Sequence, residues 1–151
     1  MAKPRITQWI TLAEVEHIAF ALARAKLAFD EPIPDFSTRY PNILESCLAT
    51  PFQRFYGITA YASLYAKSSI LFYLLIKNHP FHNGNKRIAV TTLLVFLPKH
   101  NKWLNATPEE LYKITKWVAE SAPKDKDFVL MAVGAFIKKR ICAWTDRKSD
   151  D

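Results

Sequence analysis

The sequence predicts an all-α fold, a compact bundle of about six helices, and three observations support this prediction. Two Thr-x-x-Glu segments, beginning at Thr11 and Thr107, have the pattern of a helix capping box. Two long segments in the middle of the chain are apolar on nearly all sides, as expected of helices covered by other helices. Strand signals are scarce along the whole chain, so we expect no sizeable sheet.

The length and composition fit a single domain over residues 1–151. Half of the 151 residues are hydrophobic, which is enough to bury a core and excludes a disordered chain. The N-terminus has no apolar stretch of the kind found in secretory signals, and the longest apolar runs are shorter than the roughly 20 residues of a membrane span. We therefore expect a cytoplasmic protein with no membrane partner, in which Cys47 and Cys142 form no disulfide.

The net charge of +7 favours an acidic ligand or partner. Basic residues are scattered, and the run of three at residues 138–140 is typical of a solvated helix face. A nucleotide or an acidic protein accounts for the charge as well as a nucleic acid does, and we expect no nucleic-acid partner.

The first half of the chain is expected to contain two helices before the central pair. Thr11 and Glu14 form the first capping box, so a helix is predicted over residues 12–29. A segment rich in proline and aspartate then predicts an irregular loop over residues 30–40. A short helix over residues 42–49 ends before a proline.

The central and C-terminal helices follow from the same kind of signal. Two apolar helices are predicted over residues 59–78 and 85–97, and a short polar stretch separates them. Thr107 caps a further helix that reaches about residue 121 and has proline at its first position. A last helix is predicted over residues 127–143, before a polar, frayed tail over residues 145–151.

The stretch between the central helices contains the candidate site. From residue 79 to residue 87 it reads His-Pro-Phe-His-Asn-Gly-Asn-Lys-Arg. Gly84 can adopt a positive φ and turn backbone N–H groups toward one anion, and the helix that begins at Asn85 favours a phosphate at its N-terminus. Histidine is the usual general base near neutral pH, so His79 is suited to accept a proton from an attacking hydroxyl. The stretch predicts a polyphosphate-binding loop with a base.

The same nine residues resemble the signature of the Fic/Doc family, His-x-Phe-x-Asp/Glu-Gly-Asn-Gly/Lys-Arg, at every fixed position except Asn83. Upstream, Leu-Glu-Ser-Cys-Leu-Ala-Thr-Pro at residues 44–51 is similar to Leu-Glu-Ser-Ala-Leu-Ala-x-Pro of Doc-like proteins. Lys86, and Val90 where the longer signature has a second arginine, are typical of the Doc branch. That resemblance implies transfer of the γ-phosphoryl group of ATP to a Ser, Thr or Tyr hydroxyl of a target protein, a translation factor being one such target. Transfer of AMP, as in Fic-type enzymes, is the alternative.

The resemblance also implies a role for each motif residue. His79 is the expected general base, and Arg87 is expected to stabilise charge that develops during transfer. The phosphate oxygens are expected to be held by Asn83, Gly84, Asn85, Lys86 and Arg87. Phe81 is expected in the core as the anchor of the loop.

A target-positioning flap is expected at residues 52–58, where the family has one. Its aromatic side chains, Phe52, Phe55 and Tyr56, would align a target segment beside the site. The alternative is that these three are ordinary core aromatics, and the sequence does not decide between the two roles.

Asn83 stands where the family has an acid that binds Mg²⁺ on the nucleotide phosphates. An amide oxygen can coordinate Mg²⁺ but has no charge, so the metal site is expected to be weak. Three outcomes stay open: slower metal-assisted transfer, a different phosphate-containing substrate, or a catalytically silent protein that still binds a nucleotide or a partner.

The sequence lacks the Ser/Thr-x-x-x-Glu-Gly/Asn pattern of the inhibitory helix found in many Fic proteins. The resemblance therefore implies a toxin–antitoxin module in which a separate chain is the antitoxin. A disordered acidic segment of that chain would suit the basic net charge.

Overall fold

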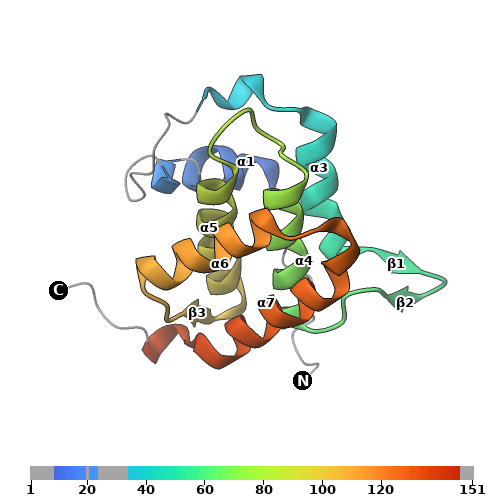
Figure 1. Ribbon diagram of the computed structural model, residues 1–151, viewed down its shortest axis with the longest axis vertical. Helices are drawn as coiled ribbons and strands as arrows, with labels where there is room; N and C mark the ends of the chain where they lie inside the picture. Colours follow the sequence, from blue (N-terminus) through green and yellow to red (C-terminus); the bar gives the residue numbers. More distant parts are fainter. Residues whose placement is uncertain (1–8, 20, 24–33, 147–151) are drawn as a thin grey trace.

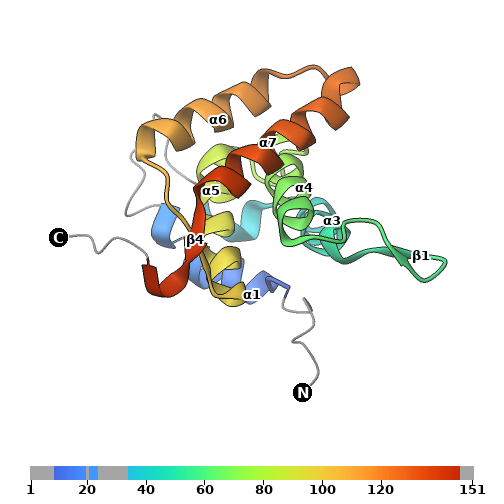
Figure 2. The same cartoon turned by 90° about the horizontal axis from the view of Figure 1, so that it is seen from below.

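The computed structural model describes residues 9–19, 21–23 and 34–146, and the predicted all-α fold is confirmed. Two helices, α4 (Leu64–Lys77) and α5 (Asn85–Phe96), pack against each other in the middle of the bundle (Figure 1). The helices around them are α1 (Leu12–Glu14), α3 (Pro41–Ala49), α6 (Pro108–Glu120) and α7 (Lys126–Arg140). Seen from below, α6 and α7 lie on one side of the central pair and α1 on the other (Figure 2).

The central helices are deeply buried. Every residue from Lys67 to Ile76 is buried, which confirms the prediction of a helix that is apolar on nearly all sides. α5 begins at the predicted residue and passes into a 3₁₀ turn (Leu97–His100) at Pro98, because proline has no N–H to continue the α-helical ladder. No helix among the described residues is long and apolar enough to cross a bilayer.

A short β-hairpin precedes α4, which therefore begins later than predicted. β1 (Arg54–Phe55) pairs antiparallel with β2 (Ile58–Thr59). Tyr56 and Gly57 at its tip have φ values of 50° and 77°, as a tight two-residue hairpin turn requires. The prediction of a helix from residue 59 is wrong, because that residue pairs in β2 and the helix begins only after Ser63, whose side chain caps its first turn.

The N-terminal capping box is formed as predicted. The side chains of Thr11 and Glu14 each accept a hydrogen bond from the other's backbone N–H, at 3.1 and 3.0 Å. α1 then passes into a π-helical turn (Val15–Ala19), and residues 24–33, which include the predicted end of this helix, lie outside the described residues. Glu14 also forms an ion pair of 2.6 Å with Lys99, which joins the first turn of α1 to the 3₁₀ turn that follows α5.

α3 confirms the short helix predicted over residues 42–49. It begins one residue earlier, at Pro41, because proline suits the first position of a helix. Its buried side includes Cys47, and burial raises the pKa of this thiol to about 11. Cys47 and Cys142 are both free thiols.

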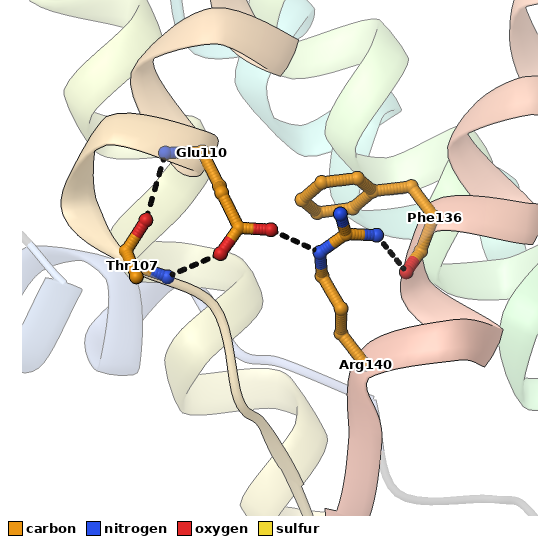
Figure 3. A network of polar contacts seen from close by, with 4 residues as sticks. All are labelled: Thr107, Glu110, Phe136 and Arg140. Atoms are coloured by element: carbon orange, nitrogen blue, oxygen red, sulfur yellow. Dashed lines mark hydrogen bonds and ion pairs between the residues drawn. The ribbon is translucent and has the colours of Figure 1, made fainter.

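The second capping box, at the start of α6, is also formed (Figure 3). Thr107 and Glu110 exchange two hydrogen bonds of 3.1 and 3.2 Å. The other carboxylate oxygen of Glu110 accepts a hydrogen bond of 2.5 Å from Nε of Arg140, whose guanidinium lies 4.0 Å from the ring centre of Phe136. The hydrogen bond from Arg140 lowers the pKa of Glu110. This pair joins the start of α6 to the end of α7.

Two short strands close the C-terminal part of the chain, a feature that the sequence pattern did not predict. β3 (Lys102–Leu104) pairs antiparallel with β4 (Ile141–Ala143). The predicted helix over residues 127–143 is therefore wrong at its end, because the backbone becomes extended after Arg140. The rings of Trp103 and Trp144 meet edge to face at 5.4 Å. Residues 147–151, which make up most of the predicted tail, lie outside the described residues.

Candidate functional site

The motif loop, residues 79–84, joins the end of α4 to the start of α5 and forms one wall of a cavity of about 410 Å³. In Figure 1 this loop lies in the upper part of the molecule, above the two central helices. The structure thus brings together around one cavity the residues predicted for the base and the phosphate site, namely His79, Asn83, Gly84, Asn85, Lys86 and Arg87.

His79 follows the end of α4 with a left-handed backbone. Its φ is 48°, a region that ends many helices and that histidine, asparagine and aspartate adopt more readily than most residues. Asn78 before it is still helical and donates a hydrogen bond of 2.9 Å to the carbonyl of Leu74. The turn leaves His79 exposed in the wall of the cavity, where its imidazole is accessible to a hydroxyl group of an incoming molecule.

Gly84 makes the sharp turn into α5. It has a φ of 77° and is the N-cap of the helix, and its carbonyl accepts a hydrogen bond of 2.9 Å from the N–H of Ile88. A residue with a side chain would be strained at this φ, which explains why position 84 is glycine. Because the first N–H groups of a helix have no partner within it, the turn starts α5 in the manner of an anion-binding helix N-terminus.

Asn85 closes the motif loop, a role that the sequence analysis did not identify. Its side chain accepts a hydrogen bond from the N–H of Phe81 and donates one to the carbonyl of Phe81, both at 2.9 Å. Asn85 is 9% exposed and Phe81 is 1% exposed, so these bonds are made in the interior. The burial of Phe81 confirms its prediction as a core anchor, while phosphate binding by Asn85 stays a prediction.

Two cations, Lys86 and Arg87, lie in the first turn of α5. Both line the cavity, but Lys86 is exposed whereas Arg87 is only 7% exposed. Cations are unfavourable at a helix N-terminus unless an anion compensates for them. The exposed Lys86 in this turn therefore favours an anionic ligand, and the forked donors of an arginine such as Arg87 suit phosphate oxygens.

The segment before α3 supports the motif loop from outside. The N–H of Tyr40 donates a hydrogen bond of 2.9 Å to the carbonyl of Pro80, and its hydroxyl lies 3.2 Å from Nδ1 of His82. When this hydroxyl donates to Nδ1, a neutral imidazole has its proton on Nε2, which is then a donor. His82, for which the sequence predicted no role, is thus an oriented side chain in the cavity wall.

The opposite wall of the cavity comes from α6, through Tyr112, Thr115 and Ala119. Their spacing places them on one helix face, but no sequence signal indicated that this face meets the motif loop. Lys77, the last residue of α4, donates hydrogen bonds to the carbonyls of Ala119 at 3.2 Å and of Ser121 at 2.6 Å. The end of α6 is therefore fixed to the end of α4 that holds the loop.

The described residues that line the cavity do not form a donor set that fits a Mg²⁺ ion. Mg²⁺ sites usually rest on one or two carboxylates, whereas none of the described lining residues is aspartate or glutamate. Asn83 offers an amide where the resemblance expects an acid, and an acid there would attract each unit of metal charge by about 4 kcal/mol at about 4 Å and an effective dielectric of about 20. The described residues also contain no cluster of three or more His, Cys, Asp or Glu able to hold a metal.

The residues predicted for the flap have two different environments. Phe52 is half-buried, and its ring lies 6.1 Å from that of Phe96 and 6.2 Å from that of Trp9. Phe55 and Tyr56 are 57% and 105% exposed on the β1–β2 hairpin, which extends from the bundle near the N-terminal end of α4 (Figure 1). The described lining of the cavity includes none of the three, and their role in positioning a target stays a prediction.

Lys67 contacts the chain just before and just after this hairpin. It is 4% exposed, and its ammonium group donates hydrogen bonds to the carbonyls of Tyr61 and Ala62. The same group lies 5.8 Å from the ring centre of Phe52, so it contacts the chain on both sides of the hairpin. Loss of hydration on burial lowers the pKa of Lys67, and the carbonyls and the ring partly replace the lost water.

The fold and the site together define a class of protein. It is an all-α bundle in which a glycine turn at the start of a buried helix presents a histidine and two cations to one cavity. The sequence profile of the Fic/DOC family matches residues 9–97, which is more than half of the chain and includes both central helices and the motif loop. The chain belongs to the Fic/DOC family.

A curated relative is the toxin Doc of Mycolicibacterium smegmatis (strain ATCC 700084 / mc(2)155). The two chains are 33% identical over 63 residues, which cover 42% of this chain and 48% of the relative. The chain thus spans about half the length of the curated relative it matches. No solved structure matches the chain.

Proposed function

We propose that the protein is a Doc-like toxin that transfers the γ-phosphoryl group of ATP to a hydroxyl of a target protein. The observation that carries this proposal is the placement of His79, the Gly84 turn and the cations Lys86 and Arg87 around one cavity. The likeness to a toxin Doc supports the toxin role, and members of the Fic/Doc family are typically transferases.

In the proposed reaction, the oxygen of a Ser, Thr or Tyr hydroxyl attacks the γ-phosphorus. The new O–P bond forms while the bond from the γ-phosphorus to the β–γ bridging oxygen breaks, and ADP leaves. The hydroxyl proton passes to the imidazole of His79. Lys86 and Arg87 hold phosphate oxygens and stabilise the negative charge that develops on the leaving ADP, and the first N–H groups of α5 add fixed dipoles of the same sign.

The choice of the γ-phosphoryl group rests on two positions. Lys86 stands where adenylyl-transferring relatives usually have glycine, and Val90, which is 2% exposed, stands where they have a second arginine. A buried valine offers no donor to a phosphate. The alternative is attack on the α-phosphorus with pyrophosphate as the leaving group, and labelled ATP distinguishes the two reactions.

The proposal also includes a cytoplasmic location and an antitoxin supplied by a separate chain. The net charge of +7 supports an antitoxin with an acidic segment. Co-expression with such an antitoxin should restore the growth of bacteria that the protein alone arrests.

The test is label transfer to proteins of a bacterial lysate from α-labelled and γ-labelled ATP, in Mg²⁺ and in EDTA. His79→Asn is the blank, because asparagine tolerates the left-handed backbone at this position. Label from γ alone, lost in His79→Asn, supports the proposal, whereas label from α indicates adenylyl transfer. Transfer by Asn83→Asp but not by the native chain indicates a silenced enzyme. No label from either indicates a protein that binds without turnover.

A further inference from the structure

We infer that the cavity binds the polyphosphate of its nucleotide without a divalent metal ion, and that protein cations take the place of the metal. This inference deepens the proposed function and rests on it for the identity of the nucleotide. The motif loop has the features of a phosphate-binding site, but the described lining residues do not provide the carboxylates on which Mg²⁺ sites usually rest.

The groups that face the cavity are cationic or neutral donors. Lys86 and Arg87 supply two positive charges, and Arg87 is more than nine-tenths buried. The Tyr40 hydroxyl lies 3.2 Å from Nδ1 of His82, and when this hydroxyl donates to Nδ1 the Nε2–H of His82 is a donor. Asn83 is exposed and uncharged. None of the described lining residues is aspartate or glutamate.

A Mg²⁺ ion in this cavity would lie close to two cations, and the described lining residues would offer it no anionic partner besides the phosphates. In a site built for Mg–nucleotide, a carboxylate attracts the ion and offsets its charge. Here the lysine and the arginine compete with the ion for the same phosphate oxygens. A metal-free triphosphate has its full negative charge available, and the arginine fork can bind two of its oxygens at once.

Two consequences separate this site from a metal-dependent one. Removal of divalent ions should leave nucleotide affinity unchanged or raise it. An acid at position 83 should create the missing metal dependence, because it adds the anion that Mg²⁺ requires and faces the same cavity.

The experiment measures binding of an ATP analogue with a fluorescent ribose group to the whole chain by anisotropy, in EDTA and in Mg²⁺. Inorganic tripolyphosphate in EDTA is the competitor, which tests whether the phosphate chain is recognised. The native protein, Asn83→Asp and Lys86→Gln are compared. Asn101→Asp is the matched control, because Asn101 is exposed and lies beyond the C-terminal end of α5, opposite the motif loop.

We expect the native Kd in EDTA to be within about threefold of the Kd in Mg²⁺ or tighter, and tripolyphosphate to compete. Mg²⁺ should tighten binding to Asn83→Asp by about tenfold or more, Lys86→Gln should weaken metal-free binding about tenfold, and Asn101→Asp should match the native chain. A tenfold tightening of the native Kd by Mg²⁺ overturns the inference but leaves the proposed transfer intact. Metal-free binding without γ-label transfer supports the inference and contradicts the proposed function. Absence of binding under both conditions overturns both.

Discussion

The motif loop and the β1–β2 hairpin lie toward opposite ends of α4, and they are built differently. The loop is fixed by the two buried hydrogen bonds between Asn85 and Phe81 and by the hydrogen bond from Tyr40 to Pro80. The hairpin extends from the other end of a helix about 21 Å long, with its tip fully exposed. The comparison indicates that one helix holds a preorganised site at one end and displays an accessible aromatic surface at the other.

The largest expected effect is on chemistry at the motif loop. His79→Asn should lower γ-label transfer by about 10²- to 10⁴-fold, because it removes the general base. The free energy of unfolding should change by less than about 0.5 kcal/mol, because His79 is exposed and asparagine tolerates its φ of 48°. Transfer rates and urea unfolding check the two parts. A variant that keeps more than a tenth of the native rate would show that another group, with His82 as the first candidate, is the base.

The next effect is on the stability of the same loop. Asn85→Ala should lower the free energy of unfolding by about 2–5 kcal/mol, because it leaves the buried N–H and carbonyl of Phe81 without these partners. Urea unfolding measures the loss, and Asn42→Ala, at an exposed position in α3, is the control with little expected change. A loss below about 1 kcal/mol would mean that burial of Phe81 is sufficient to hold the loop.

A change in the hairpin should affect the target protein and leave chemistry and stability intact. Tyr56→Asn keeps a residue that tolerates the φ of 50° and removes a fully exposed ring. We expect KM for the target to rise about tenfold with kcat unchanged, as for the loss of an aromatic anchor at an interface. Phe128→Asn, which removes a ring that is 62% exposed on α7, is the control. Equal KM values for both variants and the native chain would exclude the hairpin as a target-positioning element.

The smallest effect is expected at the junction of α6 and α7, which belongs to neither region. Arg140 lowers the pKa of Glu110 from its ordinary value of 4.5, so the pair stabilises the fold above that pH and is lost as the pH falls through the lowered value. The urea midpoint should therefore fall between pH 5 and pH 3 more for the native chain than for Glu110→Gln. Glu109→Gln, at an exposed ion pair with Lys113, is the control and should keep the native pH dependence. The effect is small because Glu110 and Arg140 are both partly exposed.

Local sequence signals predicted much of the fold. Both Thr-x-x-Glu segments form capping boxes, because a cap depends on residues three positions apart. Gly84 has the positive φ that the motif implied, and α5 begins at the residue that the motif implied. The burial of Phe81 and the central place of α4 followed from their apolar character. In each case the residues that determine the structure are near one another in sequence.

The features that the sequence did not predict depend on distant residues. The pairing of β3 with β4 joins segments far apart in the chain, and neither is long enough to show an alternating pattern. The same limit applies to the cavity, since the α6 wall is placed by tertiary packing and by Lys77. The resemblance implied that Asn85 binds phosphate, which stays a prediction. Its bonds to Phe81 depend on the path of the loop, so the sequence did not indicate them. The burial of Lys67 likewise depends on where the hairpin returns to the bundle.

The edge-to-face contact of Trp103 with Trp144 gives the protein an internal optical reporter. Indole rings 5.4 Å apart at 74° couple electronically, so their near-ultraviolet circular dichroism differs from that of separated tryptophans. One ring precedes α6 and the other follows α7, and the signal therefore changes when β4 leaves β3. Separation of β4 from β3 can thus be followed without a label while turnover is measured. The two signals distinguish a movement of the β3–β4 pair from the reaction at the motif loop.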